Sequence, residues 1–314
     1  MKVSDQVYGE VDIREKVLEE MLDSEALTRL RASPVPGTNP LVNAYRHALG
    51  TMILTRRFVG SIQWQVAALL HESAPRDYGG VIELVLDKFV RVAYDAKKFG
   101  EYVREKRVPS LLERYGLNPA FLFEEAPLIG GAGFSLHTID QTLRAAVEHG
   151  YRNVVQKCLD SLTMRDHLIV FDAREGAEQF FECGKLVQDD KADRVQRMAG
   201  TYVLARAVNA ALDAKIISMK DLMNGTQGIR GTLYGAGTDD IRSALDLLDG
   251  GFEVSVSPEN PEYLINLKRE VPDPLFVDVD DKVKRLSDVS TQYKAWSAQV
   301  QKENEVPIVI VPER

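Results

Sequence analysis

The chain has 314 residues, and its 39 Lys and Arg residues against 47 Asp and Glu residues give a formal net charge of −8. Hydrophobic residues make up 45% and charged residues 27% of the chain, which is typical of a globular protein and excludes a disordered or collagen-like one. Two cysteines are too few for a disulfide scaffold or a cysteine-rich zinc site.

The charge balance and the lack of long apolar runs indicate which partners the protein can bind and where in the cell we expect it. An acidic chain lacks the basic surface field on which non-specific nucleic-acid binding depends. No apolar run approaches the roughly 20 residues that span a bilayer. Residues 1–20 are charged throughout and lack the apolar core of a signal peptide. We therefore expect no partnership with nucleic acid or membrane, and a cytoplasmic protein with reduced cysteines.

Most of the chain up to about residue 248 has the apolar periodicity of helices. A helical face is predicted within 12–30, and two prolines and a glycine break the pattern at 33–37. Two apolar helices follow at 41–58 and 61–72, joined at Gly60. Further helices are predicted at 81–89, 94–105, 110–115, 138–150, 151–161, 174–186, 192–214 and 218–248.

After Gly250 and Gly251 the pattern changes to the alternation of strands. Strands are predicted at 252–256, 263–267, 275–278 and 306–311. The length of the chain allows two domains. The sequence therefore predicts a mainly α protein, with a helical domain at 1–248 and a small α/β C-terminal extension at 249–314.

Any histidine-based metal site must be drawn from five residues, which are His47, His71, His137, His149 and His167. The pair His71-Glu72 ends an apolar helix, and His47 lies inside another. A buried charge is costly unless it is paired or bound to a metal, so this pair is a candidate for metal binding. Two packed helices would bring His47 and His71 together, although a single histidine on an apolar helix is more often a core residue.

Five short motifs follow one another in a fixed order. They are Val7-Tyr8-Gly9-Glu10-Val11, Ala26-Leu27-Thr28-Arg29-Leu30-Arg31, Arg46-His47-Ala48-Leu49-Gly50, Ala67-Ala68-Leu69-Leu70-His71-Glu72 and the segment from His137 to Gly150. Together they resemble the HD-domain superfamily of metal-dependent phosphohydrolases, most closely the branch of the SAM-and-HD-domain dNTP triphosphohydrolase and the bacterial dGTP triphosphohydrolases. The resemblance covers nearly the whole chain. It implies an HD-domain helical bundle with a small C-terminal α/β appendage.

The resemblance also implies a set of metal ligands. His47 matches the first histidine of the family, His71-Glu72 matches its His-Asp pair, and His137 aligns with its last aspartate. A register shift of three residues would make Asp140 the ligand in place of His137. Three imidazoles and one carboxylate suit one divalent transition metal (Fe, Mn, Co, Ni or Zn) better than Mg²⁺. A protein that holds no metal is the alternative.

The residues that follow the His-Glu pair depart from the family. Pro75 and Gly80 stand where the family has its catalytic histidines. Arg76 is a candidate to bind phosphate and Asp77 is a candidate catalytic acid or base. A solvated loop pair is the alternative interpretation of Arg76 and Asp77.

The segment after His137 holds the other candidates. Asp140 is a second candidate catalytic residue. Arg144 and Gln141 are candidates for substrate binding, and Gln141 stands where the family has a tyrosine that packs on the sugar of the substrate. Asp140 and Arg144 are four residues apart on one helix, so they could equally form a structural ion pair.

Three functions are compatible with these residues. The first is a divergent HD-type metal-dependent phosphohydrolase acting on a small phosphorylated molecule, with a nucleotide as the foremost candidate. The second is a catalytically degenerate HD protein that binds a nucleotide or a partner. The third is a mononuclear metal oxygenase or lyase on the same fold. The resemblance further implies a homo-oligomer.

Overall fold

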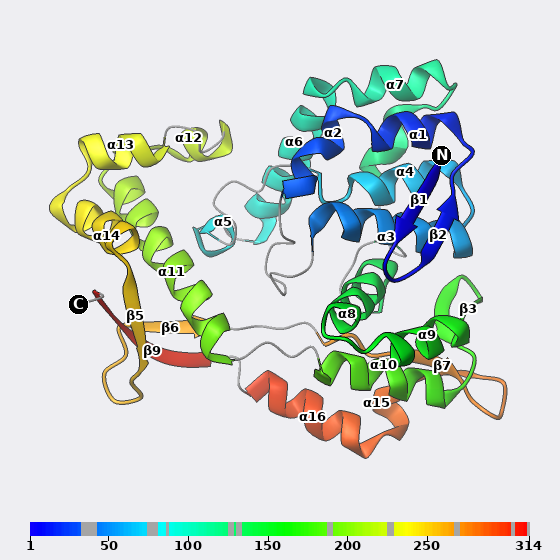
Figure 1. The fold of residues 1–314 in the computed structure, drawn as a ribbon. Coiled ribbons are helices and arrows are strands. Elements are labelled where there is room, and N and C mark those ends of the chain that lie inside the picture. Colours follow the sequence, from blue (N-terminus) through cyan, green and yellow to red (C-terminus); the bar gives the residue numbers. More distant parts are fainter. Residues whose placement is uncertain are drawn as a thin grey trace. The chain divides into compact units, whose positions relative to one another are not determined.

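A computed structural model describes residues 1–32, 43–73, 81–85, 88–124, 129, 134–186, 191–224, 229–266, 271–302 and 305–312. These residues form a mainly α protein, as the sequence predicts, and they include three small sheets (Figure 1). No helix in these ranges is long and apolar enough to cross a membrane.

The chain forms two compact units, and each is assembled from three segments. Unit 1 comprises Met1–Ala74, Lys98–Gln188 and Glu270–Ser297, and unit 2 comprises Pro75–Lys97, Asp189–Arg269 and Ala298–Arg314. The predicted boundary after residue 248 falls within unit 2, inside helix α14 (Asp239–Gly250). Helices α6 (Lys88–Glu105) and α16 (Thr291–Lys302) contribute residues to both units.

Unit 1 contains most of the helices. Its helical elements are α1 (Lys16–Leu22), α2 (Glu25–Thr28), η1 (Arg29–Ala32), α3 (Ala44–Phe58), α4 (Ile62–Leu70), α7 (Val108–Arg114), η2 (Pro119–Phe123), α8 (Leu136–Glu148), α9 (Arg152–Ser161), α10 (Arg174–Leu186) and α15 (Leu286–Val289). Its strands are β1 (Lys2–Asp5), β2 (Gly9–Asp12), β3 (Leu162–Arg165), β4 (Leu168–Phe171), β7 (Leu275–Val277) and β8 (Val283–Arg285).

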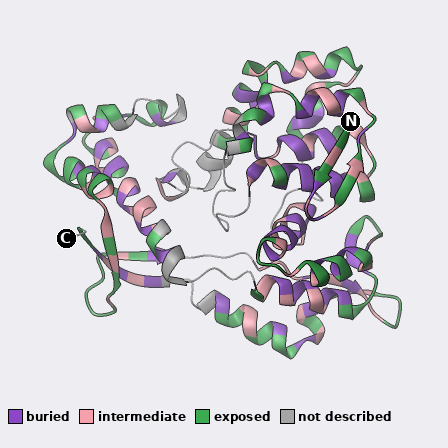
Figure 2. Ribbon diagram, in the orientation of Figure 1, coloured by how far each residue is buried: buried purple, intermediate pink, exposed green. Residues whose placement is uncertain are grey.

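The core of unit 1 lies around α3, α4 and α8. Helix α3 packs against both of the others, and its residues from His47 to Thr55 are all buried (Figure 2). A helix that is buried all round must lie inside a bundle. Strands β1 and β2 pair as an antiparallel hairpin, while β3, β4, β7 and β8 form a second sheet in that order. Burial on this scale fixes the positions of the polar side chains that α3 carries.

Unit 2 combines a helical layer with a small sheet. Its helices are α5 (Val81–Val85), α11 (Lys191–Asp213), α12 (Met219–Asn224), α13 (Ile229–Ala236) and α14, and its strands are β5 (Phe252–Val256), β6 (Tyr263–Asn266) and β9 (Glu305–Pro312). The strands are antiparallel in the order β5-β9-β6. Alternate residues of β9, namely Val306, Ile308 and Ile310, are buried with Ala199 and Val203 of α11. The strand predicted at 306–311 is therefore confirmed.

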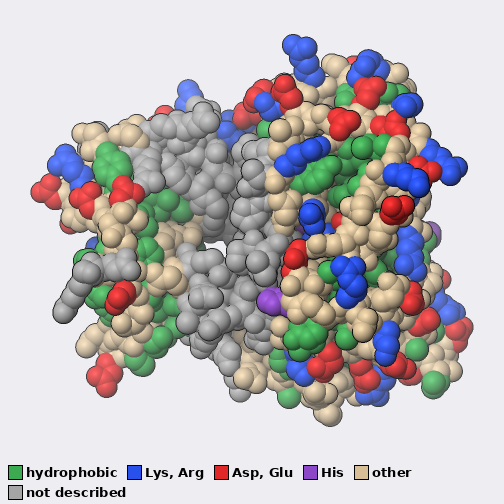
Figure 3. All heavy atoms as spheres, viewed as in Figure 1, with side chains coloured by type: hydrophobic (Ala, Val, Ile, Leu, Met, Phe, Trp, Pro, Cys, Tyr) green, Lys and Arg blue, Asp and Glu red, His purple; other side chains and the backbone are tan. Residues whose placement is uncertain are grey.

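The charged side chains of unit 1 are interspersed rather than segregated. Lys and Arg side chains stand among Asp and Glu side chains over its visible face (Figure 3). Exposed ion pairs such as Arg114–Glu20 (2.6 Å) and Arg174–Glu178 (2.7 Å) account for part of this pattern. Such surface pairs contribute little to stability, at most about 1 kcal/mol each.

Candidate metal site

Helix α3 places His47 in the interior of unit 1. The helix begins after Asn43, whose side chain accepts a hydrogen bond from the amide of Arg46. The amide of His47 itself donates to the carbonyl of Asn43 at 2.9 Å. The His47 side chain lies one turn into the helix and is completely buried. Its position is therefore set by a capped helix inside the core.

The end of α4 holds His71 and Glu72, as the sequence predicts. His71 is the residue that caps α4, and its Nδ1 atom donates to the carbonyl of Ala68 at 2.6 Å. Ser73 secures the same turn, because its amide and hydroxyl both donate to the Leu70 carbonyl. Glu72 is buried, with 8% of its surface exposed.

Helix α8 contributes the third histidine from its first turn. Ser135 caps the helix, and its side chain and that of Thr138 form a reciprocal capping box. Such a box fixes the helix start by satisfying two backbone donors. His137 lies between these two residues, and its amide donates to the Ile129 carbonyl at 3.0 Å.

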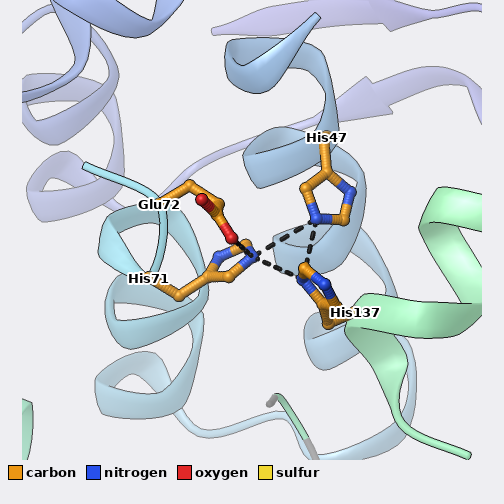
Figure 4. Close-up of side chains that lie close together, drawn as sticks. All are labelled: His47, His71, Glu72 and His137. Atoms are coloured by element: carbon orange, nitrogen blue, oxygen red, sulfur yellow. Dashed lines mark hydrogen bonds and ion pairs between the residues drawn. The ribbon is translucent and has the colours of Figure 1, made fainter. Parts of the chain in front are cut away.

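The side chains of His47, His71, Glu72 and His137 converge (Figure 4). One ligand atom from each lies within 4.8 Å of every other. His47 Nε2 lies 2.9 Å from His137 Nδ1 and 3.3 Å from His71 Nε2, and His71 Nε2 lies 3.0 Å from His137 Nδ1. Glu72 Oε1 lies 4.0 Å from His71 Nε2. Three helices thus present three nitrogens and one carboxylate to a common point.

The tautomers of two histidines are fixed by their partners. Asp140 Oδ2 accepts a hydrogen bond from His47 Nδ1 at 2.7 Å, so the proton of a neutral His47 ring resides on Nδ1. The Ala68 carbonyl accepts a hydrogen bond from His71 Nδ1, so the proton of a neutral His71 ring also resides on Nδ1. Both rings therefore turn an Nε2 lone pair toward the cluster. A carboxylate or carbonyl behind each imidazole is the usual arrangement behind metal-binding histidines.

The four residues fit a single divalent transition metal. The lone pairs of His47 Nε2 and His71 Nε2 face one another at 3.3 Å, an arrangement that a cation between the two rings would stabilise. With nitrogen–metal distances of about 2.1 Å, the three nitrogen separations correspond to ligand–metal–ligand angles of roughly 90–105°. One ion can satisfy all three nitrogens at once, with Glu72 in reach as an anionic ligand. Imidazole-rich sets favour Fe, Mn, Co, Ni or Zn.

The electrostatics of the cluster favour a neutral imidazole at His137. Burial, followed by repulsion from His47 and His71, lowers the pKa of His137 from 6.5 to about 3. A metal ligand must be deprotonated, and this shift keeps His137 unprotonated at neutral pH.

Behind His47 lies a buried ionic network. Asp140 accepts hydrogen bonds from Arg144 Nε at 3.1 Å and Arg144 Nη2 at 2.9 Å, and Arg144 Nη1 donates to Asp5 at 3.0 Å. The side chains of Asp140 and Arg144 are completely buried. Burial alone would raise the pKa of Asp140, but the charge of Arg144 and the hydrogen bond from His47 outweigh it and lower the pKa to about 2. Asp140 is therefore an anion at neutral pH.

The remaining sequence candidates fall in different places. Arg76 and Asp77 lie outside the described residues. Gln141 is half-buried, one helical turn after His137 and therefore on the same side of α8. Arg144 is enclosed between Asp5 and Asp140, and this geometry favours a structural role over the predicted contact with substrate. His149 and His167 are exposed.

Two residues of the network had no predicted role. Asp5 and Tyr8 belong to the N-terminal hairpin, and the Tyr8 hydroxyl donates to Asp140 Oδ1 at 2.7 Å. The Val7-Tyr8-Gly9 motif marks this segment in the sequence, but nothing in it indicates a partner 132 residues away.

The contact between α3 and α8 depends on Gly50. A Cβ atom at Gly50 would lie 1.9 Å from Asp140 Oδ1 and 2.1 Å from Arg144 Nη2. We expect Gly50→Ala to lower the free energy of unfolding by about 1–3 kcal/mol, because a buried overlap must displace the network. Urea denaturation of the metal-free protein measures this change.

Gly184→Ala is the matched control, because a Cβ atom there, inside α10, meets nothing within 4 Å. Alanine is the better helix former, so this variant should gain roughly 0.5–1 kcal/mol. Equal stability of the two variants would contradict the close approach at Gly50.

The sequence is similar to two known proteins. No family model matches the sequence. The chain is 26% identical over 314 aligned residues to an uncharacterized protein, YdhJ, of Bacillus subtilis, covering 93% of this chain and 96% of that protein. It is 30% identical over 192 residues to the metal-dependent phosphohydrolase cns2 of Cordyceps militaris, covering 56% of each.

A solved structure shares the fold over the full length. The crystal structure of a phosphohydrolase from Bacteroides thetaiotaomicron superposes with a TM-score of 0.60 at 14% identity, covering 100% of both chains. The two chains thus share a mainly α architecture with small sheets. Taken together, the relatives, this fold and the His/Glu cluster support an HD-domain-like family for the chain.

Proposed function

We propose that this protein is a metal-dependent phosphohydrolase that acts on a small phosphorylated substrate. One observation carries the proposal, which is the convergence of three imidazole nitrogens and a carboxylate from three helices. The similarity to the metal-dependent phosphohydrolase of Cordyceps militaris, and the fold shared with the phosphohydrolase of Bacteroides thetaiotaomicron, support the same class of reaction.

We assign the metal ligands to His47 Nε2, His71 Nε2, His137 Nδ1 and a Glu72 oxygen. When bound by these residues, a divalent metal would supply Lewis-acid polarisation of a phosphoryl oxygen and lower the pKa of a bound water. Asp140 holds His47 in the Nδ1–H tautomer and stabilises its orientation. We therefore assign Asp140 a positioning role, in place of the catalytic role that the sequence suggested.

The substrate contacts are proposed from the sequence. Arg76 and Asp77 follow the His71-Glu72 pair within five residues of the sequence. We propose that Arg76 binds phosphate and that Asp77 transfers a proton. Gln141 is proposed to contact the substrate from α8. A nucleotide is the substrate class that the resemblance to dNTP triphosphohydrolases favours.

Phosphate release tests the proposed reaction. The metal-free protein is reloaded with Mn²⁺, Fe²⁺, Co²⁺, Ni²⁺ or Zn²⁺ and incubated with nucleoside mono- and triphosphates, sugar phosphates and p-nitrophenyl phosphate. At least one metal should support release of phosphate or triphosphate, and His137→Ala should abolish it while the exposed-residue variant His149→Ala retains it.

A protein that binds metal stoichiometrically but releases nothing from the whole panel would contradict a phosphohydrolase. That outcome would favour the oxygenase or lyase alternative on the same fold.

A further inference from the structure

We propose that the N-terminal hairpin β1–β2 is a positioning element of the metal site, with Tyr8 as the positioning residue that acts through Asp140. The proposal rests on the metal site proposed above. The hairpin lies far along the chain from every proposed metal ligand, the first of which is His47.

The turn of the hairpin is built to present Tyr8. Asp5 Oδ1 accepts hydrogen bonds from the amides of Val7 at 2.8 Å and Tyr8 at 3.2 Å. Gly9 follows with φ +75, a left-handed conformation that glycine adopts at little cost. The backbone of residues 5–9 is therefore held in a tight turn by the carboxylate of Asp5.

The same carboxylate attaches the turn to helix α8. Asp5 Oδ2 accepts from Arg144 Nη1 at 3.0 Å, and 4% of the Asp5 surface is exposed. The Arg144 guanidinium also lies 5.9 Å from the centre of the Tyr8 ring, within the range of a cation–π contact. The hairpin is thus fixed to α8 by both of these side chains.

The Tyr8 hydroxyl is the fourth hydrogen-bond donor to the Asp140 carboxylate. A carboxylate has about four lone-pair sites. In Asp140 they are used by Tyr8 Oη and Arg144 Nη2 on Oδ1, and by His47 Nδ1 and Arg144 Nε on Oδ2. Loss of the Tyr8 hydroxyl would leave Oδ1 with Arg144 Nη2 as its one donor, so the carboxylate that orients His47 would be held less firmly.

The charges explain why a neutral donor is needed at this point. Asp5 and Asp140 share the single cation Arg144, so the three buried side chains carry a net charge of −1 when ionised. A tyrosine hydroxyl donates a hydrogen bond to Asp140 without cancelling the remaining negative charge. That charge faces His47 Nδ1 and strengthens the opposite nitrogen as a ligand.

Metal affinity of Tyr8→Phe is the direct test. The variant keeps the ring and removes one hydroxyl, so it is expected to fold. Zn²⁺ affinity is measured by competition with a chromophoric chelator, and the absorption spectrum of the Co²⁺-loaded protein reports the ligand geometry. We expect about tenfold weaker Zn²⁺ binding, at the low end of the range for outer-shell partners of metal ligands, and an altered Co²⁺ spectrum.

Tyr115→Phe is the matched control, because the exposed Tyr115 hydroxyl also donates to a carboxylate, that of Glu20, but belongs to neither the cluster nor its network. Its Zn²⁺ affinity should stay within twofold of the wild type. Wild-type affinity in Tyr8→Phe would overturn the inference, even if its metal-free form melts at a lower temperature, because the hydroxyl would then be merely structural. If the wild type itself binds no metal, the proposed function fails as well.

Discussion

His47→Ala should remove the metal and the activity together. The variant deletes the ligand that lies deepest in the cluster and leaves His71 Nε2 and His137 Nδ1 without the nitrogen that completes their set. We expect metal content to fall from about one equivalent to below about 0.1, and phosphate release to fall at least about 100-fold, because loss of a ligand exceeds the 10–100-fold effect of an outer-shell change. Elemental analysis and the phosphate assay measure the two quantities.

His149→Ala is the control for the loss of an imidazole. His149 caps the far end of α8 and is exposed, so its variant should keep both metal and activity. Circular dichroism establishes that His47→Ala retains the helical fold. A folded His47→Ala protein with full metal content would show that the ligand set is wrong.

Arg144→Met should be the most destabilising substitution in the buried network. It removes the cation that Asp5 and Asp140 share and leaves two buried carboxylates without it. Removing one partner of a buried ion pair costs about 3–5 kcal/mol, because an uncompensated charge remains in the interior. Urea denaturation of the metal-free protein at neutral pH measures the change in the free energy of unfolding.

The matched control is Arg114→Met. Arg114 pairs with Glu20 at 2.6 Å, but 63% of its side chain is exposed. The loss of this surface pair should cost less than about 1 kcal/mol. Equal effects of the two substitutions would contradict the view that Arg144 stabilises unit 1 by compensating buried charge.

Strong periodicity made several elements predictable. The helix predicted at 174–186 has the bounds of α10, and the strand predicted at 252–256 has those of β5. Helix α10 buries one regular face, and β5 alternates the half-buried Phe252 and Val254 with exposed residues, so the spacing of their apolar residues reflects their structure directly. The end of α4 at His71-Glu72 is confirmed for the same reason, since a continuous apolar run stops there.

Two hairpins could not be found in this way. Strands β1 and β2 have four residues each, and most of their side chains are exposed or half-buried, so no apolar alternation marks them. The β3–β4 turn consists of Asp166 and His167, both with positive φ. Because such turns usually contain glycine or asparagine, this pair gives little signal for a hairpin.

The candidate site was predictable only in part. The order of the motifs was enough to single out His47, His71, Glu72 and His137, which the structure brings together. The hydrogen bond from Tyr8 to Asp140 joins residues 132 positions apart, and only the packing of the hairpin against α8 determines it. A hydrogen bond between residues so far apart leaves no periodic pattern in the sequence, so the role of Tyr8 could be inferred only from the structure.

Anomalous diffraction from crystals of the protein purified without added metal tests the central claim most directly. We predict one anomalous peak at a transition-metal absorption edge, about 2.0–2.2 Å from His47 Nε2, His71 Nε2 and His137 Nδ1. A peak bound to other residues, or no peak in crystals where the three nitrogens still face one another, would contradict a metal site at this cluster.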